Sequence, residues 1–343
     1  MTDTLWTLTL TLGAIGFGLN IAGLLGWVER KQSAVLQDRI GANRASIFGF
    51  TLLGLFHPLA DALKTMTKED FAPPFALKPW HGLAPALSLG FSMLALAALP
   101  YGEVIEFAGR SWRLQPLPLS GGVVFVLGTL AIGVHGVVMA GYASNSNYAL
   151  LGGLRGAAQM VSYEVSMLTS LAALLFIYGT LDLGQAVRWQ AAHGLWGIVL
   201  QPLGFILFMT AGAAETKRTP FDLPEGEAEI VGYFIEYSGM KFVMFMMTDF
   251  METIVLAGLC TTLYLGGWHL PGLLSLPQPF LGLAQIAVFS TKTCAVIFLL
   301  MQIRWTLPRF RFDQLLHLGW KNLLPLSLAN VFVTLWVVYF LQS

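Results

Sequence analysis

Charged residues are scarce in this 343-residue chain: Asp, Glu, Lys and Arg together make up 11% of it, whereas soluble domains contain about 25%. Hydrophobic residues make up 56%, and the mean hydropathy is +0.68. This balance excludes an ordinary soluble domain and indicates an integral membrane protein. Because the net charge is zero, no overall field attracts a polyanion, and we expect no nucleic-acid partner.

Cysteine is nearly absent, since Cys260 and Cys294 are the only two and both fall in apolar runs. An iron–sulfur cluster takes about four ligands, so we expect none in this chain. No histidine pair has the spacing of helical metal ligands, so we expect no metal site either. Residues 1–28 contain no Lys or Arg ahead of their apolar stretch, whereas a secretory signal has a basic front. We therefore expect this segment to be a retained first span.

Long apolar runs, in contrast, are frequent. About 20 apolar residues cross a bilayer as a helix. The runs predict an all-α integral membrane protein with about eight transmembrane helices, forming a single polytopic domain over residues 1–343. The predicted spans are 5–28, 82–100, 120–141, 160–180, 196–214, 240–266, 282–303 and 323–341.

The distribution of Lys and Arg between the loops predicts the orientation. The odd-numbered loops hold fifteen of these cations and the even-numbered loops three. Cytoplasmic loops carry the excess of cations, so the odd loops are expected in the cytoplasm. Both termini are then expected on the periplasmic side of a bacterial inner membrane.

The first loop, residues 29–80, is too long for a simple connection. Within it, residues 46–66 read "SIFGFTLLGLFHPLADALKTM", which alternates apolar and polar positions at helical spacing and is broken by Pro58. This pattern predicts an amphipathic helix that lies along the membrane surface.

Acidic residues are concentrated in one connection, "AETKRTPFDLPEGEAEIVGYFIE", which carries six carboxylates between residues 215 and 236. Asp222 can cap a helix, with Glu225 completing a capping box. If that helix continues, Asp222, Glu225, Glu229 and Glu236 share one face within about 60°. Crowded carboxylates repel one another, so some should hold protons near neutral pH and pass them on. An ordinary solvated acidic loop is the alternative.

The ionisable residues inside or at the start of predicted spans include Glu164, Asp249, Glu252 and Lys292. Ionisable groups within a membrane are costly and usually line a protein interior or a wet path. For Glu164, Asp249 and Lys292 the hypothesis is a proton path, and the alternatives are snorkelling or a structural ion pair. The sequence assigns no role to Glu252.

Several segments together carry a family resemblance. They are "VERKQSAVLQDRIGANR", "PLADALKTMTKED", "YASNSNYALLGGLRGAAQMVSYEV", "AETKRTPFDLPEGEAE", "EYSGMKF" and "RWTLPRFRFDQLLHLGWK". In this order they resemble the H subunit of respiratory complex I, which is the quinone-site membrane subunit of a proton-translocating NADH:quinone oxidoreductase. The resemblance covers nearly the whole chain and every odd-numbered loop.

The resemblance implies a tunnel for quinone and the start of a chain of charges in the membrane. It implies quinone as substrate, but no complete active site and no bound cofactor in this chain alone. FMN and iron–sulfur clusters are expected in partners, which are soluble quinone-site and iron–sulfur subunits, antiporter-like membrane subunits and membrane lipid. The implied quinone-binding residues are Glu29, Arg30, Asp61, Arg218, Phe221 and Asp222. The implied proton path comprises Arg155, Glu164, Glu215, Glu225, Glu227, Glu229, Asp249 and Lys292.

Some positions depart from the family pattern. Ala42 stands where Pro is usual, His57 where Gln is usual, and Asp249 where Glu is usual. The interval from Glu229 to Glu236 is one residue shorter than in many members of the family, so no role is carried over to Glu236. No role is carried over to His57 either, because its residue type differs from the family's.

Other functions remain open at this point. They are a sister subunit of a hydrogenase-type complex, a free-standing transporter that uses Asp249 and Lys292 as its ion site, and a passive membrane anchor.

Overall fold

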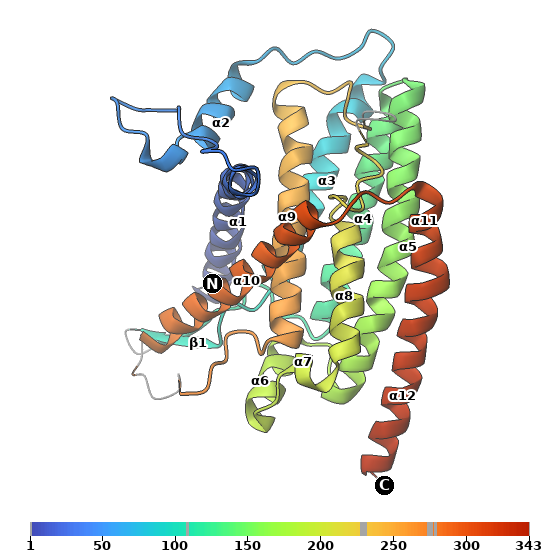
Figure 1. The fold of residues 1–343 in the computed structure, drawn as a ribbon. Helices are drawn as coiled ribbons and strands as arrows, with labels where there is room; N and C mark the ends of the chain where they lie inside the picture. Colours follow the sequence, from blue (N-terminus) through green and yellow to red (C-terminus); the bar gives the residue numbers. More distant parts are fainter. Residues whose placement is uncertain (1, 108–109, 227–231, 273–276, 278–279, 343) are drawn as a thin grey trace.

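The structure is a computed structural model that describes residues 2–107, 110–226, 232–272, 277 and 280–342. Most of the described chain is helical, and its long helices stand side by side as a bundle (Figure 1). The long and apolar helices are α1 (Thr2–Leu36), α3 (Lys78–Ala98), α4 (Gly122–Ala143), α5 (Asn147–Tyr178), α8 (Pro202–Glu215), α9 (Gly239–Tyr264), α10 (Phe280–Thr306) and α12 (Leu324–Gln342). The shorter elements are η1 (Leu52–Gly54), α2 (His57–Thr67), β1 (Val104–Phe107), β2 (Arg110–Arg113), α6 (Leu183–His193), α7 (Gly197–Leu200), α11 (Phe312–His317) and the π-helical turn η3 (Leu318–Leu323).

The expected all-α, multi-pass membrane fold is confirmed. Seven helical segments of the described chain are long and apolar enough to cross a bilayer, and α8 is a shorter apolar helix. Each predicted span overlaps a helix, but several helices extend beyond the apolar run. α5 begins at Asn147, so Arg155 lies inside a helix rather than in a loop. Hydropathy marks only the apolar part of a helix, whereas the helix itself continues past the membrane core.

The predicted span 196–214 is divided into α7 and α8 at Gln201. Gln201 has φ −137° and ψ 66°, and Pro202, which has no amide hydrogen, opens α8. The Gln201 side chain donates to Thr334 Oγ1 (2.6 Å) and accepts from Asn330 Nδ2 (2.9 Å). Both partners lie on α12, so this helix satisfies the polar side chain at the break.

α9 lies at the centre of the bundle, with α1 on one side of it, α3 and α8 on the other, and α10 crossing it (Figure 1). Every residue from Thr248 to Tyr264 is buried. A helix that is buried on all sides belongs to the interior of a protein. Asp249 and Glu252 therefore lie inside the bundle and do not face lipid.

The predicted surface helix is present but shorter than the alternating pattern. It begins at His57, and Pro58 occupies its first turn, where a missing amide hydrogen costs nothing. Residues 46–56 form turns and η1 instead, and Leu53 O accepts a hydrogen bond from Trp27 Nε1 of α1 (3.2 Å). Figure 1 shows α2 beside the bundle, next to the end of α1 that lies away from the N-terminus.

A short hairpin, which the sequence did not reveal, lies at the opposite end of the bundle. β1 and β2 pair antiparallel, with Val104 opposite Arg113. Trp6 Nε1 donates to Arg113 O (3.1 Å), so the N-terminal part of α1 lies at this end. The C-terminus, α6 and α7 are on the same side (Figure 1).

The helix expected after Asp222 is absent from the described part of the acidic loop, residues 216–226 and 232–238. The Asp222 carboxylate accepts a hydrogen bond from Arg309 (2.7 Å) instead of capping a helix. Gly232 has a φ of +135°, which no helix contains. The predicted alignment of four carboxylates on one helical face is therefore wrong, and Glu229 lies outside the described residues.

Candidate functional site

An apolar cavity of about 610 Å³ opens between α1, α2 and α9. Gly23, Trp27, Val243 and Met247 are among the residues that line it. The polar groups of its wall come mostly from α2 and the adjoining part of α1. Arg30 and Asp61 are two of them, and their side chains pair at 2.7 Å while half exposed.

A smaller, charged cavity of about 220 Å³ lies between α9, the acidic loop, Glu29 of α1 and Arg304 of α10. Both cavities are lined by Phe242, Met246 and Phe250, which are spaced four residues apart and therefore form one stripe along the helix. This stripe is a wall between an apolar chamber and a charged one. Five carboxylates or cations of the sequence-predicted site line the charged cavity: Glu29, Arg218, Asp222, Glu225 and Asp249.

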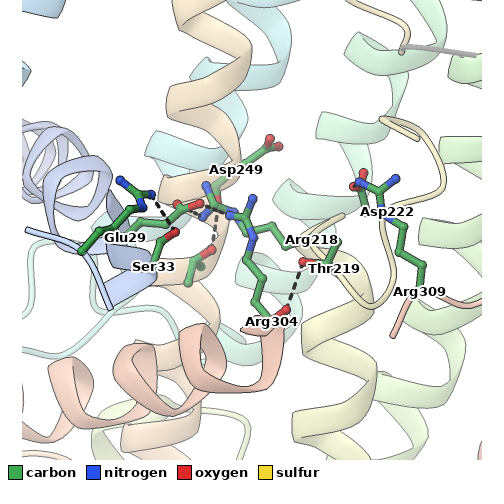
Figure 2. Close-up of polar contacts among 10 residues, drawn as sticks. Glu29, Ser33, Arg218, Thr219, Asp222, Asp249, Arg304 and Arg309 are labelled. Carbon is green, nitrogen blue, oxygen red and sulfur yellow. Dashed lines mark hydrogen bonds and ion pairs between the residues drawn. The ribbon is translucent and has the colours of Figure 1, made fainter. Parts of the chain in front are cut away.

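Glu29 joins three parts of the chain at the charged cavity. It lies on α1 and accepts hydrogen bonds from Arg218 of the acidic loop (2.7 Å) and from Arg304 of α10. Figure 2 shows both arginines converging on Glu29, while Asp222 faces Arg309 to one side. The Arg218 guanidinium also stacks over the Phe250 ring, 4.0 Å from its centroid. A change of charge in this cavity thus acts on α1, α10 and the wall of α9.

Lys217, which also lines this cavity, carries a fully buried positive charge. Its Nζ lies 2.9 Å from Asp249 Oδ1 and 3.4 Å from Glu252 Oε2, and its side chain is 0% exposed. Burial alone lowers the pKa of an ammonium group, but the charges of Asp249 and Glu252 outweigh it and hold the Lys217 pKa well above its usual range.

Glu225 connects the acidic loop to the buried ion pairs. Burial raises the pKa of its carboxyl well above the usual range, and the nearby charges of Asp249 and Asp222 raise it further. The cations Lys217 and Arg218 act in the opposite direction but do not compensate. Glu225 is therefore a carboxyl that can hold a proton at the pH where an exposed glutamate has lost it.

Glu215 lies deeper, at the end of α8, and is 1% exposed. Neither of its carboxyl oxygens has a hydrogen-bond partner among the residues that the structure describes. It experiences the charges of Glu252, Glu164 and Lys217. Glu164, on α5, is therefore within electrostatic reach of the group, whereas Arg155, on the same helix, lies over the Phe312 ring at 5.7 Å.

The acidic loop is fixed to α5 by a buried glutamine. Gln159 Nε2 donates to Ala214 O and to Phe221 O, both at 2.6 Å. Phe221 is buried between Tyr163 and Phe310 (ring centroids 5.7 and 5.4 Å) and lines neither of the two cavities. The structure thus places this predicted quinone-binding residue behind the charged chamber.

Lys292 is remote from the other predicted path residues. Its Nζ donates to the carbonyls of Leu265 (2.7 Å), Gly267 (3.1 Å) and His269 (2.7 Å), just beyond the end of α9. Asp249 lies about 24 Å away from this point along α9, at 1.5 Å per residue. The two residues therefore do not share an ion site. Glu227 and Glu229, also predicted for the path, lie outside the described residues.

Four charged residues at the site received no role from the residue pattern: Lys217, Glu252, Arg304 and Arg309. A signal for the first two was present, because Asp249 and Glu252 are three residues apart and so share one face of a helix. Two buried carboxylates on one face require a cation, and Lys217 follows the preceding apolar run directly. The family resemblance placed Arg304 of α10 near the charged path, but no pattern in the sequence identified its contact with Glu29.

Comparisons with known proteins show the family of this chain. A family model described as NADH dehydrogenase matches residues 9–335. The H 1 subunit of NADH-quinone oxidoreductase from Geobacter metallireducens is 46% identical over 321 residues, 93% of this chain and 92% of its own length. The H 2 subunit from Geobacter sulfurreducens is 45% identical over 94% and 93% of the two chains. The H subunit from Anoxybacillus flavithermus is 41% identical over 96% and 94%. The chain therefore belongs to the family of H subunits of NADH-quinone oxidoreductase, respiratory complex I.

Proposed function

We propose that this subunit guides quinone from the membrane to the charged cavity and couples its reduction to proton translocation. The observation that carries the proposal is the pair of cavities that share the Phe242–Met246–Phe250 wall. A membrane quinone has an apolar tail and a polar head that takes up two protons when it is reduced. The apolar cavity suits the tail, and the charged cavity suits the head.

The buried charges behind the charged cavity supply a route for protons. Glu225 is the outermost carboxyl, and the Lys217 group with Asp249 and Glu252 comes next. Glu215 and then Glu164 continue the route toward α5. Glu215 has no hydrogen-bond partner in the described part of the chain, and such a carboxyl is suited to gain and lose a proton as neighbouring charges change.

Coupling follows from the shared electrostatics. Reduction of a quinone near Arg218 draws protons from the nearest acids and leaves extra negative charge on the cavity wall. Glu29 forms ion pairs with both Arg218 and Arg304. The extra negative charge competes with Glu29 for these two arginines and so changes the strength of the ion pairs. The buried acids respond because charges interact strongly where water is scarce. Lys292 has no place in this route, since three backbone carbonyls fix its ammonium at the far end of α9.

The remaining assignments concern the assembly. We place the subunit in the bacterial inner membrane with the acidic loop and α2 on the cytoplasmic side, following the excess of Lys and Arg. Soluble quinone-site and iron–sulfur subunits would then dock over these loops, supplying FMN and the iron–sulfur clusters. Antiporter-like membrane subunits would continue the proton route.

Photolabelling of the intact complex with a quinone analogue tests the route of the quinone. We expect crosslinks at Arg30, Asp61 and the Phe242–Phe250 stripe. Labels confined to the lipid-facing side of α12 would contradict the proposal.

Glu215→Gln tests the route of the protons. We expect fewer protons pumped per quinone reduced in vesicles, because the middle carboxyl of the route can no longer ionise. Glu103→Gln is the matched control, since Glu103 pairs with Arg188 at the hairpin end of the bundle. Normal pumping in the Glu215 variant would contradict this part of the proposal.

A further inference from the structure

We infer that an anionic phospholipid binds at the rim of the apolar cavity, with its headgroup on Lys64 and Lys68 and an acyl chain inside. Both lysines belong to the wall of this cavity, together with Arg30 and Asp61. The lipid would share this cavity with the proposed quinone route, and its site differs from that route in the charged headgroup that the rim binds.

The position of α2 places these lysines at membrane level. Leu59, Leu63 and Met66 of this helix are 50%, 57% and 64% exposed. They lie on the side of α2 that faces away from the cavity. A helix with such an exposed apolar ridge lies in the interface, with the ridge among acyl chains and its charged residues at the headgroups. Lys64 and Lys68 are then at the depth where phosphate groups are found.

The charges at the rim do not cancel. Arg30 is paired with Asp61, the single carboxylate among the described residues that line the cavity. None of the ion pairs found in the described part of the chain includes Lys64 or Lys68, and both side chains are exposed. Lys64 and Lys68 therefore bring two ammonium groups, neither of them in an ion pair of the described residues, to the mouth of an apolar chamber, where Glu69 is the next acidic residue along the chain.

The chemistry of the cavity selects the occupant. A quinone carries no charge, so it can form no ion pair with the two lysines. An amphiphile with a negative head and an apolar chain matches a cationic rim above an apolar interior. Anionic lipids in a leaflet attract each basic residue near the surface. Of the two sources of a phosphate group, only a phospholipid also fills the interior, which a free phosphate does not.

The test uses the intact complex in nanodiscs that contain phosphatidylcholine and a phosphatidylglycerol with a photoreactive group in its acyl chain. We expect crosslinks at Trp27 and Met246, inside the cavity. Lys64→Gln and Lys68→Gln should each lower the yield about fivefold, the effect of one basic residue at a membrane surface. Lys78→Gln is the matched control, because Lys78 is exposed and does not line the cavity.

Two further measurements identify the ligand. Photoreactive phosphatidylcholine should label these positions weakly, and inorganic phosphate at constant ionic strength should not compete. Equal labelling by the two lipids, equal yields from the lysine variants and the control, or displacement by phosphate would each overturn the inference. Because crosslinking requires no turnover, its outcome is independent of whether quinone passes through the same cavity.

Discussion

Lys217 neutralises two buried carboxylates, those of Asp249 and Glu252. Its ammonium group lies between Asp249 and Glu252 with no exposure to solvent. Taking one member from a buried group of charges leaves the others uncompensated, which destabilises a protein by about 3–5 kcal/mol. The same group lies beside the charged cavity, so stability and proton transfer share these side chains.

We predict that Lys217→Met destabilises the protein by about 3–5 kcal/mol, because Asp249 and Glu252 lose the one cation that pairs with them among the described residues. Thermal unfolding of the purified complex, followed through loss of this subunit, measures the change. Lys217→Met combined with Asp249→Asn and Glu252→Gln should recover much of the stability, since the buried charges are then gone. A single Lys217→Met variant as stable as the wild type would show that the ion pairs contribute little.

At the scale of elements, α9 separates the two cavities and also carries the buried carboxylates of Asp249 and Glu252. Phe242, Met246 and Phe250 present one stripe to both chambers, and Asp249 faces Lys217 from the adjacent position. A quinone head that moves from the apolar to the charged chamber must displace these side chains. Flexible Met246 is flanked by two rings, so it is the part of the wall best able to move.

We predict that Met246→Trp lowers kcat/KM for quinone about tenfold, equal to about 1.4 kcal/mol, because a rigid ring replaces the mobile side chain. Electron transfer from NADH to a soluble acceptor that bypasses the quinone site should not change. Met240→Trp, on the same helix but outside both cavities, is the control. Equal losses in the two variants would indicate a general distortion of α9 rather than a gate.

At the scale of the whole molecule, the bundle has two unlike ends. The acidic loop, α2 and the charged cavity lie at one end, and the hairpin, α6, α7 and both termini lie at the other (Figure 1). The excess of Lys and Arg belongs to the first end. From the positive-inside rule we predict that the proposed quinone site lies near the cytoplasm and the hairpin on the opposite side of the membrane.

We predict that a thiol at the hairpin, introduced by Glu106→Cys, reacts with a membrane-impermeant reagent in intact cells. A thiol at Glu69→Cys, beyond α2, should react only in inverted vesicles. Both variants are made in a background with Cys260→Ala and Cys294→Ala. The reverse pattern of labelling would invert the proposed orientation.

The sequence alone determined the membrane fold, because apolar runs of bilayer length leave a chain few choices other than helices. It also determined which loops carry charge. Local sequence patterns gave wrong predictions where residues distant in sequence determine the local structure. Asp222 accepts a hydrogen bond from Arg309 instead of capping a helix. At Gln201 the helix is interrupted, and α12 provides the hydrogen-bond partner of its side chain.

Only the tertiary structure decided which charges meet. Lys217, Asp249 and Glu252 come from two segments, and Glu29, Arg218 and Arg304 come from three. It also separated Lys292 from this group, although its place within a predicted span resembled that of Asp249. The physical reason is that electrostatic energy depends on distance and burial in space, and periodicity along the chain specifies neither between helices.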